Sequence, residues 1–362
     1  MDQAIKKSIR QAVKQGSEAY VQSLCEAQSD SDAAARYAID VAIASGKEIL
    51  IDQLVPLLSK SFAVYPLDVA AKAGSVRAVE QLMAFCDAED DEALMLAARH
   101  GHTECVKRLL KECSPLQHDS LALYGAARHG HADVVFQLLL CSDAKAQGSR
   151  ALIAACREGH LEVVKHLLPF SSKIQCAQHG LAAAAENNHI EVVEFLIEAG
   201  LPDPEDTFSL GLNVAAAKGH EQLVRTLLWA IVRTGRAPRD FGQEAMITAA
   251  TNGNASIVKS ILEFANKACY PEGGLFTALQ YGHEEVADVL VRRVNLDHVR
   301  GLIPNVRGLI AADEMAGRLD KALARVDAAK QHRELQSNER KRVAQSDAAE
   351  PVMKNSSRSV RL

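Results

Sequence analysis

The chain has 362 residues, a formal net charge of −5 and only 4% aromatic residues. This mild acidity argues against nucleic-acid binding by bulk electrostatic attraction. No segment approaches the run of about 18 apolar residues that a membrane-spanning helix needs, so we expect no membrane partner.

Residues 1–35 are expected to form N-terminal degenerate or capping helices. They only weakly echo the repeat that begins at residue 36, with Gly16 in an equivalent place. Terminal units of a repeat array are atypical because they expose one face to water. The stretch also lacks the continuous apolar core of a signal peptide.

A repeat marked by the dipeptide Gly-His occupies residues 36–291. The dipeptide occurs at Gly101–His102, Gly130–His131, Gly159–His160, Gly219–His220 and Gly282–His283. Weaker copies are centred on Gly46, Gly74, Asn188 and Gly253, and successive copies lie 27 to 34 residues apart. A unit of this length cannot bury its own apolar face and must stack on its neighbours.

Each unit contains two helical patterns, one on either side of the glycine. Leu94 and Ala97 precede Gly101 by seven and four residues, and an alanine keeps that place in every copy. After the glycine, Val106 and Leu109 return at helical spacing. The pattern predicts a short Ala-rich inner helix, a left-handed turn at the glycine and an outer helix with one apolar stripe.

Segments 97–110, 126–139, 154–168 and 215–228 resemble ankyrin repeats, whose signature includes A-A-x-x-G-H-x-x-V-V-x-x-L-L. The resemblance covers residues 36–291. It implies an all-α, ankyrin-type α-solenoid of stacked helix-turn-helix repeats with a concave binding face. An ankyrin unit normally has about 33 residues and most units here are about four residues shorter. We therefore expect the hairpin fingers to be reduced or absent.

Two stretches of wider spacing are expected to be loops. Residues 199–211 resemble a fuller finger or loop, and residues 230–243 form an insertion that carries arginines. Loops carry binding functions more often than helices do. Trp229, the only tryptophan, is expected to end an outer helix, either as a cap over the apolar stripe or as a contact residue.

The C-terminal part is expected to contain two segments. Residues 292–336 are predicted to form C-terminal capping helices, and residues 337–362 a disordered basic tail. The tail contains the run Arg340–Arg342, which resembles a short nuclear-import cluster. A solvated basic run is the alternative interpretation.

The eight cysteines include no C-x-x-C pair, and Cys105 and Cys156 occupy apolar positions of the repeat. They are interpreted as buried thiols of a reducing compartment, so we expect the cytoplasm, with the nucleus as an alternative.

The histidines next to the glycines are expected to be structural. Equivalent positions of neighbouring repeats are about 8–10 Å apart, too far to share a zinc ion bonded at about 2 Å. We expect these residues to start the outer helices and to form local hydrogen bonds. The sequence contains no nucleophile elbow, phosphate loop or metalloprotease motif, so we predict no metal, no cofactor and no catalytic residue.

The two residues before each glycine are the candidate binding positions. Arg99, Arg128 and Arg157 are in register and would form a ladder suited to an acidic or phosphorylated segment, because guanidinium groups bind such anions in bidentate fashion. An ordinary solvated surface is the alternative. The full set of candidate partner-binding residues is Arg99, His100, Arg128, His129, Arg157, Glu158, Glu186, Asn187, Lys218, Trp229, Arg233, Arg236, Arg239 and Tyr281.

Tyr124 and Phe276 have two interpretations. They are either anchors beside that face or, as we favour, core residues in the place where an ankyrin unit has a histidine.

The sequence therefore predicts a non-catalytic scaffold or adaptor that binds a partner protein on the concave face of a monomeric array. The alternative is an effector of a pathogen or parasite that uses the same repeats to bind host proteins in the host cytosol. A third hypothesis, from a different functional class, is that the protein is an enzyme.

Overall fold

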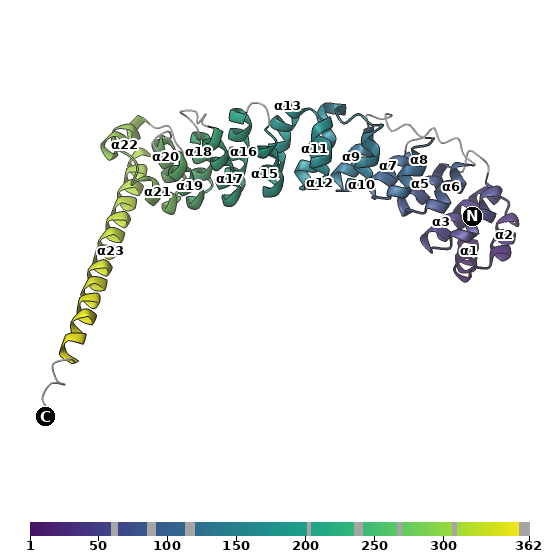
Figure 1. Ribbon diagram of the computed structural model, residues 1–362, viewed down its shortest axis with the longest axis horizontal. Coiled ribbons are helices and arrows are strands. Elements are labelled where there is room, and N and C mark those ends of the chain that lie inside the picture. The colour runs from purple at the N-terminus through teal and green to yellow at the C-terminus, as the bar shows by residue number, and fades with distance from the viewer. Residues whose placement is uncertain are drawn as a thin grey trace, which may run out of the picture. The chain divides into compact units, whose positions relative to one another are not determined.

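The computed structural model describes residues 1–58, 64–84, 92–112, 120–200, 204–234, 242–265, 270–305 and 310–354. Throughout these ranges the regular elements are helical, and no strand occurs in them. The chain divides into two compact units, Met1–Gly211 and Leu212–Leu362. Figure 1 shows helices standing side by side along each unit. The expected all-α solenoid is confirmed.

The first unit begins with helices that lack the Gly-His dipeptide of the repeats. They are α1 (Gln3–Gln15), α2 (Glu18–Glu26), α3 (Ser31–Ala44), η1 (Glu48–Leu50), α4 (Ile51–Leu54) and η2 (Val55–Leu57). α1 ends at Gly16 in the left-handed conformation, with φ of 71°. Ile9 and Val13 of α1 and Ile39 of α3 are fully buried, so these helices share one core with the repeats.

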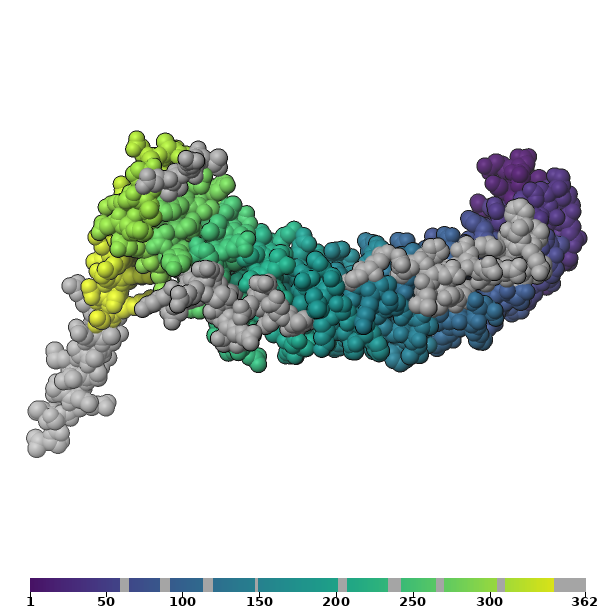
Figure 2. All heavy atoms as spheres, turned by 90° about the horizontal axis from the view of Figure 1, so that it is seen from above, coloured from purple at the N-terminus to yellow at the C-terminus, as the bar shows by residue number. Residues whose placement is uncertain are grey.

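In the described part of the first unit, five helix pairs follow in two layers. The inner helices are α5 (Val64–Ala73), α7 (Glu92–Arg99), α9 (Leu121–Arg128), α11 (Ala146–Glu158) and α14 (Leu181–Glu186). The outer helices are α6 (Val76–Met83), α8 (Thr103–Leu109), α10 (Ala132–Leu139), α12 (Leu161–Leu167) and α15 (Ile190–Glu198). Inner helices pack on inner helices and outer helices on outer ones. Figure 2 shows these helices packed against one another in chain order, from blue to teal.

The two layers follow from residue size. Ala97 and Ala126 of the inner helices are fully buried, and their small side chains allow close packing between helices. Val106 and Leu109 of an outer helix are also fully buried and form its apolar stripe. Each such aliphatic side chain contributes about 1.5–3 kcal/mol on burial. The repeating alanines and leucines therefore determine both the pairing and the stacking of the helices.

The connections in the middle of the first unit are short and lack a hairpin finger. Residues 140–145, between α10 and α11, form turns. Between α12 and α14 the chain forms η5 (Leu168–Phe170), α13 (Lys173–Gln175) and η6 (Cys176–Gly180). Helical turns thus replace the fingers in these two repeats, as the short repeat length predicted.

The second unit contains three more helix pairs and a terminal segment. Its elements are α16 (Pro204–Lys218), which contains the division between the units, α17 (Glu221–Thr234), α18 (Gln243–Thr251), α19 (Ala255–Ala265), α20 (Pro271–Tyr281), α21 (Glu284–Leu290), α22 (Leu296–Leu302), η7 (Ile303–Asn305) and α23 (Ala312–Lys354). α23 packs on α20 and α21 through the buried Met315, Leu319 and Ala322.

The loop expected at residues 199–211 is wrong over most of its length. Helix α16 begins at Pro204, so residues 204–211 are helical, while residues 201–203 lie outside the described ranges. A proline at the first helical position followed by acidic residues is a helix-start signal. The wider spacing therefore reflects a longer inner helix.

The insertion expected at residues 230–243 is also shorter than predicted. Outer helix α17 continues to Thr234, so Trp229 lies within the helix and Arg233 in its last turn. The extra turns fit the apolar residues Ala230 and Ile231, which are buried. Arg236 and Arg239 lie outside the described residues.

The C-terminal region differs from the disordered tail expected after residue 337. α23 is a single helix to Lys354, and residues 355–362 lie outside the described part of the chain. Residues 330–341 are exposed, so packing does not explain their conformation. The sequence is rich in Ala, Gln, Glu, Lys and Arg, which have high helix propensity.

Candidate protein-interaction surface

The turn between the two helices of a repeat has the backbone that the sequence predicted. Gly101, Gly130 and Gly159 have φ values of 79°, 80° and 80°, and Asn188 has φ of 61°. This left-handed region disfavours side chains with a Cβ atom, except for asparagine and aspartate. The glycine therefore ends the inner helix and sets the direction of the outer one.

Histidines that follow the turn residue bind the preceding repeat. Nε2 of His131 donates a hydrogen bond to the carbonyl of Arg99 at 3.0 Å, and Nε2 of His160 donates to the carbonyl of Arg128 at 3.1 Å. The same contact joins His102 to Lys72 at 2.9 Å, His189 to Arg157 at 2.9 Å and His283 to Thr251 at 2.7 Å. The expectation of local hydrogen bonds is therefore wrong, because these side chains satisfy carbonyls at the end of another helix.

The imidazole ring also packs against the glycine of the preceding repeat. A Cβ atom on Gly101 would lie 2.6 Å from the ring of His131, and one on Gly130 would lie 2.7 Å from the ring of His160. Glycine is thus needed for two reasons: it adopts the left-handed backbone, and it has no Cβ atom that would collide with the imidazole ring. In the first unit, contacts of this kind join neighbouring repeats from Gly74 to His189.

The same contacts hold the candidate binding residues in place. Lys72, Arg99, Arg128 and Arg157 each stand two positions before a glycine, and each backbone carbonyl accepts a hydrogen bond from a histidine of the next repeat. Their side chains are exposed. We call these four residues the cationic column. Lys72 was not among the predicted site residues, although it occupies the same register position.

Two side chains of the cationic column, those of Arg99 and Arg128, contact the following repeat. Arg99 Nε donates to Nε2 of His129 at 3.4 Å, and Arg128 Nε lies 3.8 Å from Oε1 of Glu158. Within the described residues, the Arg157 side chain has no ion pair. Exposed contacts of this kind contribute about 0–1 kcal/mol, so they leave the guanidinium groups available to a ligand.

Two histidines beside the cationic column have lowered pKa values, first through partial burial and then through neighbouring charges. Partial burial and the charges of Lys72 and Arg99 lower the pKa of His100. Partial burial, Arg99 and Arg128 lower the pKa of His129, while Glu158 opposes this effect. Neighbouring cations disfavour the charged imidazolium form. The cations of the column therefore add to the effect of burial on both imidazoles.

Two cation–π pairs lie on the inner helices of the first unit. The guanidinium of Arg150 lies 4.2 Å from the ring centroid of Tyr124, and that of Arg36 lies 4.9 Å from the ring of Tyr65. Tyr124 is half-buried, so it is neither a core residue nor a free anchor. Arg150 was missed because it stands outside the two positions that vary before each glycine.

The other predicted site residues lie in different places. Glu186 ends inner helix α14, and the side chain of Asn187 donates to the carbonyl of Ala183 at 3.0 Å. In the second unit, Lys218 and Tyr281 end inner helices. Trp229 and Arg233 are exposed on an outer helix, so they do not belong to an inner-helix surface.

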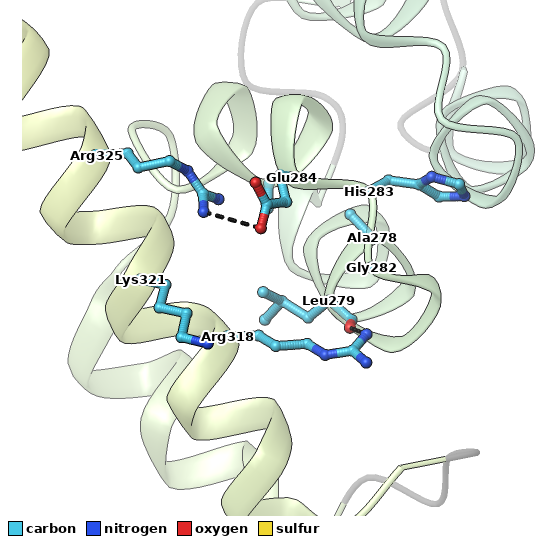
Figure 3. Close-up of a pocket in the computed structure, with 9 residues that line it drawn as sticks. Ala278, Leu279, Gly282, His283, Glu284, Arg318, Lys321 and Arg325 are labelled. Atoms are coloured by element: carbon cyan, nitrogen blue, oxygen red, sulfur yellow. Dashed lines mark hydrogen bonds and ion pairs between the residues drawn. The ribbon is translucent and has the colours of Figure 1, made fainter.

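The C-terminal end of the repeats uses an arginine in place of the missing next histidine. Arg318 of α23 donates to the carbonyls of Leu279 at 2.7 Å and Gln280 at 3.3 Å, beside Gly282. Arg325 pairs with Asp288 at 2.8 Å and with Glu284 at 3.3 Å. Figure 3 shows both arginines reaching from α23 toward the turn, around a cavity of about 250 Å³. α23 thus contacts the turn of the last described repeat.

Two searches of the described residues bear on other kinds of site. No group of three or more His, Cys, Asp or Glu side chains gathers there in a metal-binding arrangement. No described helix combines the length and apolarity required to cross a membrane.

This geometry defines a helical-repeat protein in which each repeat is a helix-turn-helix, and in which histidine contacts join several neighbouring repeats. The family model for ankyrin repeats (three copies) matches residues 39–119, 67–148, 123–207 and 212–299, which is more than half of the chain. The chain belongs to the ankyrin repeat family.

Among solved structures, the chain is similar to the human ASB11 ankyrin repeat domain. The two share 23% sequence identity with a TM-score of 0.45, and the match covers 55% of this chain and 96% of that one. No curated protein sequence matches the chain at a significant level.

Proposed function

We propose that this protein is a non-catalytic scaffold or adaptor that binds a partner protein through the inner-helix surface of its ankyrin array. Ankyrin repeats are generally protein–protein interaction modules, and most of the chain consists of them. The observation that carries the proposal is the cationic column, in which four exposed basic residues repeat in register.

The partner chemistry follows from the side chains of the cationic column. Arginine binds carboxylate and phosphate groups through two parallel hydrogen bonds. We therefore propose an acidic or phosphorylated segment of a partner protein. Of the predicted site residues, this surface includes Arg99, Arg128 and Arg157.

We propose different roles for the central array and for the helices at its two ends. Residues 36–291 act as the binding array, and the flanking helices protect its two ends from water. The contacts of Arg318 with the carbonyls beside Gly282 support the capping role of the C-terminal part. We propose that the array acts as a monomer.

The cytoplasm is the compartment that fits this proposal best. Cys25, Cys105, Cys156 and Cys176 are buried free thiols. Unpaired buried cysteines are typical of proteins that fold under reducing conditions.

Charge reversal of the cationic column tests the proposed function. The double variant Arg128→Glu/Arg157→Glu should abolish capture of the partner in affinity purification followed by mass spectrometry, with thermal unfolding nearly unchanged. The matched control Lys107→Glu/Lys165→Glu makes the same charge change on outer helices, where both lysines pair with a glutamate on their own helix. Retention of the same partners by the double variant would rule out the cationic column as the site.

A further inference from the structure

The residues of the cationic column are regularly spaced, because each lies at the same position of an inner helix in successive repeats. Inner helices pack at about 8–10 Å from one another. The contact between α7 and α9 is close: a Cβ atom on Gly125 would lie 3.5 Å from Cβ of Arg99. One positive charge therefore recurs at roughly 9 Å along the inner-helix surface.

The cationic column also has defined ends. Two positions before Gly46 the chain has Ala44, and two positions before Asn188 it has Glu186. The run of basic residues in register therefore comprises Lys72, Arg99, Arg128 and Arg157 only. A ligand that follows the surface meets four cations in a row, and the basic register does not continue at Glu186.

Only some backbone conformations present anions at this spacing. A polyproline II segment rises about 3.1 Å per residue with three residues per turn, so residues i and i+3 lie on one side about 9.3 Å apart. A β-strand rises about 3.3 Å per residue, but its residues i and i+3 point to opposite faces. An α-helix matches only through residues i and i+7, and four contacts would need about 22 residues against about ten in the extended segment.

On the basis of the proposed function, we propose that the ligand is an extended, polyproline II-like segment with an acidic residue at every third position. Four acidic residues at i, i+3, i+6 and i+9 would each contact one residue of the cationic column. Such a segment needs no folding on binding, which lowers the entropic cost. Its acidic run matches the length of the four-residue cationic column.

Carboxylates fit the charge distribution better than phosphates do. The cationic column offers one positive charge per repeat, whereas phosphate recognition typically uses clusters of arginines. One ligand carboxylate, with a charge of −1, is thus enough to neutralise each residue of the cationic column. Glu158, which lies 3.8 Å from Arg128, occupies the place that a ligand carboxylate would take. It therefore competes with the ligand.

Synthetic peptides test the spacing directly. The full chain is titrated into four labelled peptides and binding is followed by fluorescence anisotropy at low salt. One peptide contains four Pro-Pro-Glu repeats, and two have the same composition with the glutamates clustered or alternating. The fourth is a helical peptide with glutamate at every seventh position. We expect the Pro-Pro-Glu peptide to bind about tenfold more tightly than the others, because the others form fewer simultaneous ion pairs.

Three variants assign that binding to the cationic column. Arg128→Gln should weaken binding of the Pro-Pro-Glu peptide about threefold, and Glu158→Gln should strengthen it. Arg108→Gln is the matched control, because Arg108 is similarly exposed and pairs with Glu80 on the outer helices. Equal effects of Arg108→Gln and Arg128→Gln would contradict the assignment.

The outcomes separate this inference from the proposed function. If all acidic peptides bind alike and Arg128→Gln weakens each of them, the spacing rule is wrong while the anionic site stands. Preference for the helical peptide would also overturn the extended conformation. If no acidic peptide binds and the Arg128→Glu/Arg157→Glu variant still captures its partner, the proposed function fails together with the inference.

Discussion

Nε2 of His160 donates a hydrogen bond to the carbonyl of Arg128 at 3.1 Å, and the same imidazole ring covers Gly130. One side chain thus joins two repeats and fixes the backbone from which an exposed arginine extends. The stability of the stack and the position of the candidate binding surface therefore depend on the same contacts.

Removal of the ring should destabilise the fold measurably. We expect His160→Ala to lower the free energy of unfolding by about 1–2 kcal/mol, because the carbonyl of Arg128 loses its donor. Urea denaturation followed by circular dichroism measures the change. His298→Ala, at an exposed histidine of α22, is the control. An equal loss in both variants would contradict a role of the Gly-His contact in stacking.

Replacing Gly130 with alanine should lower the free energy of unfolding by more than the strain of its left-handed backbone alone. Gly130→Ala must adopt φ near 80° and also displace the ring of His160, which would lie 2.7 Å from the new Cβ atom. Gly16→Ala needs a similar φ of 71° but has no atom within 4 Å of its Cβ. We expect Gly16→Ala to cost about 1–2 kcal/mol in denaturation and Gly130→Ala distinctly more. Equal costs would show that the ring yields freely.

Asp40 should make the stability of the protein depend on pH. Burial, opposed by the charge of Arg36, raises its pKa from 3.8 to about 6, and its Oδ1 atom is buried without a hydrogen-bond partner. The folded state therefore binds the proton more tightly than the unfolded state, so stability falls as the pH rises from about 4 to about 6.

The variant Asp40→Asn removes this titration. We expect it to raise the free energy of unfolding at pH 7 by about 1–2 kcal/mol, a value reduced for the partial exposure of the group. Thermal unfolding between pH 4 and 8 measures the effect, with Asp133→Asn, an exposed position of α10, as control. A variant that keeps the pH profile of the original chain would contradict the assignment to Asp40.

The capping role of α23 can be measured locally. Arg318→Ala removes the donor to the carbonyls of Leu279 and Gln280 and the ion pair with Glu314 at 2.8 Å. We expect amide hydrogen exchange in α20 and α21 to increase by about tenfold, equivalent to about 1.4 kcal/mol of local stability. Lys321→Ala, three residues later on the same helix, should change it little. Equal exchange in both variants would exclude a specific cap by Arg318.

The comparison of sequence and structure shows what periodicity can predict. The positions of Gly130, of the buried Ala126 and of the stripe with Val135 follow from spacing within one unit, because burial repeats with the helix. The partner of His160 does not follow, since its carbonyl belongs to a residue 32 positions earlier in another repeat. Contacts between units require the stacking geometry.

The distance between repeats in the sequence also leaves part of the structure unpredicted. A wider gap predicts extra residues but not their conformation, so residues 204–211 could be assigned to a loop although they lengthen α16. The signal that could have corrected this is Pro204 with two acidic residues after it. Arg318 carries no repeat signature at all, because it lies on α23 beyond the last Gly-His dipeptide.

Binding of an acidic ligand to the cationic column should depend on pH through His100 and His129. In the free protein, partial burial and the neighbouring cations lower the pKa of both imidazoles. A bound carboxylate beside them would favour the imidazolium form and raise these pKa values. The complex then binds more protons than its free components, so affinity must increase as the pH falls.

The Pro-Pro-Glu peptide measures this linkage. Between pH 8 and pH 5.5 we expect its affinity to rise about threefold for the original chain. In the double variant His100→Gln/His129→Gln the affinity should change little over that range, because neither position can gain a proton. The glutamates of the peptide remain mostly ionised above pH 5.5. A pH dependence that persists unchanged in the double variant would place the titrating group elsewhere, whereas its loss would assign the proton to the histidines of the binding surface.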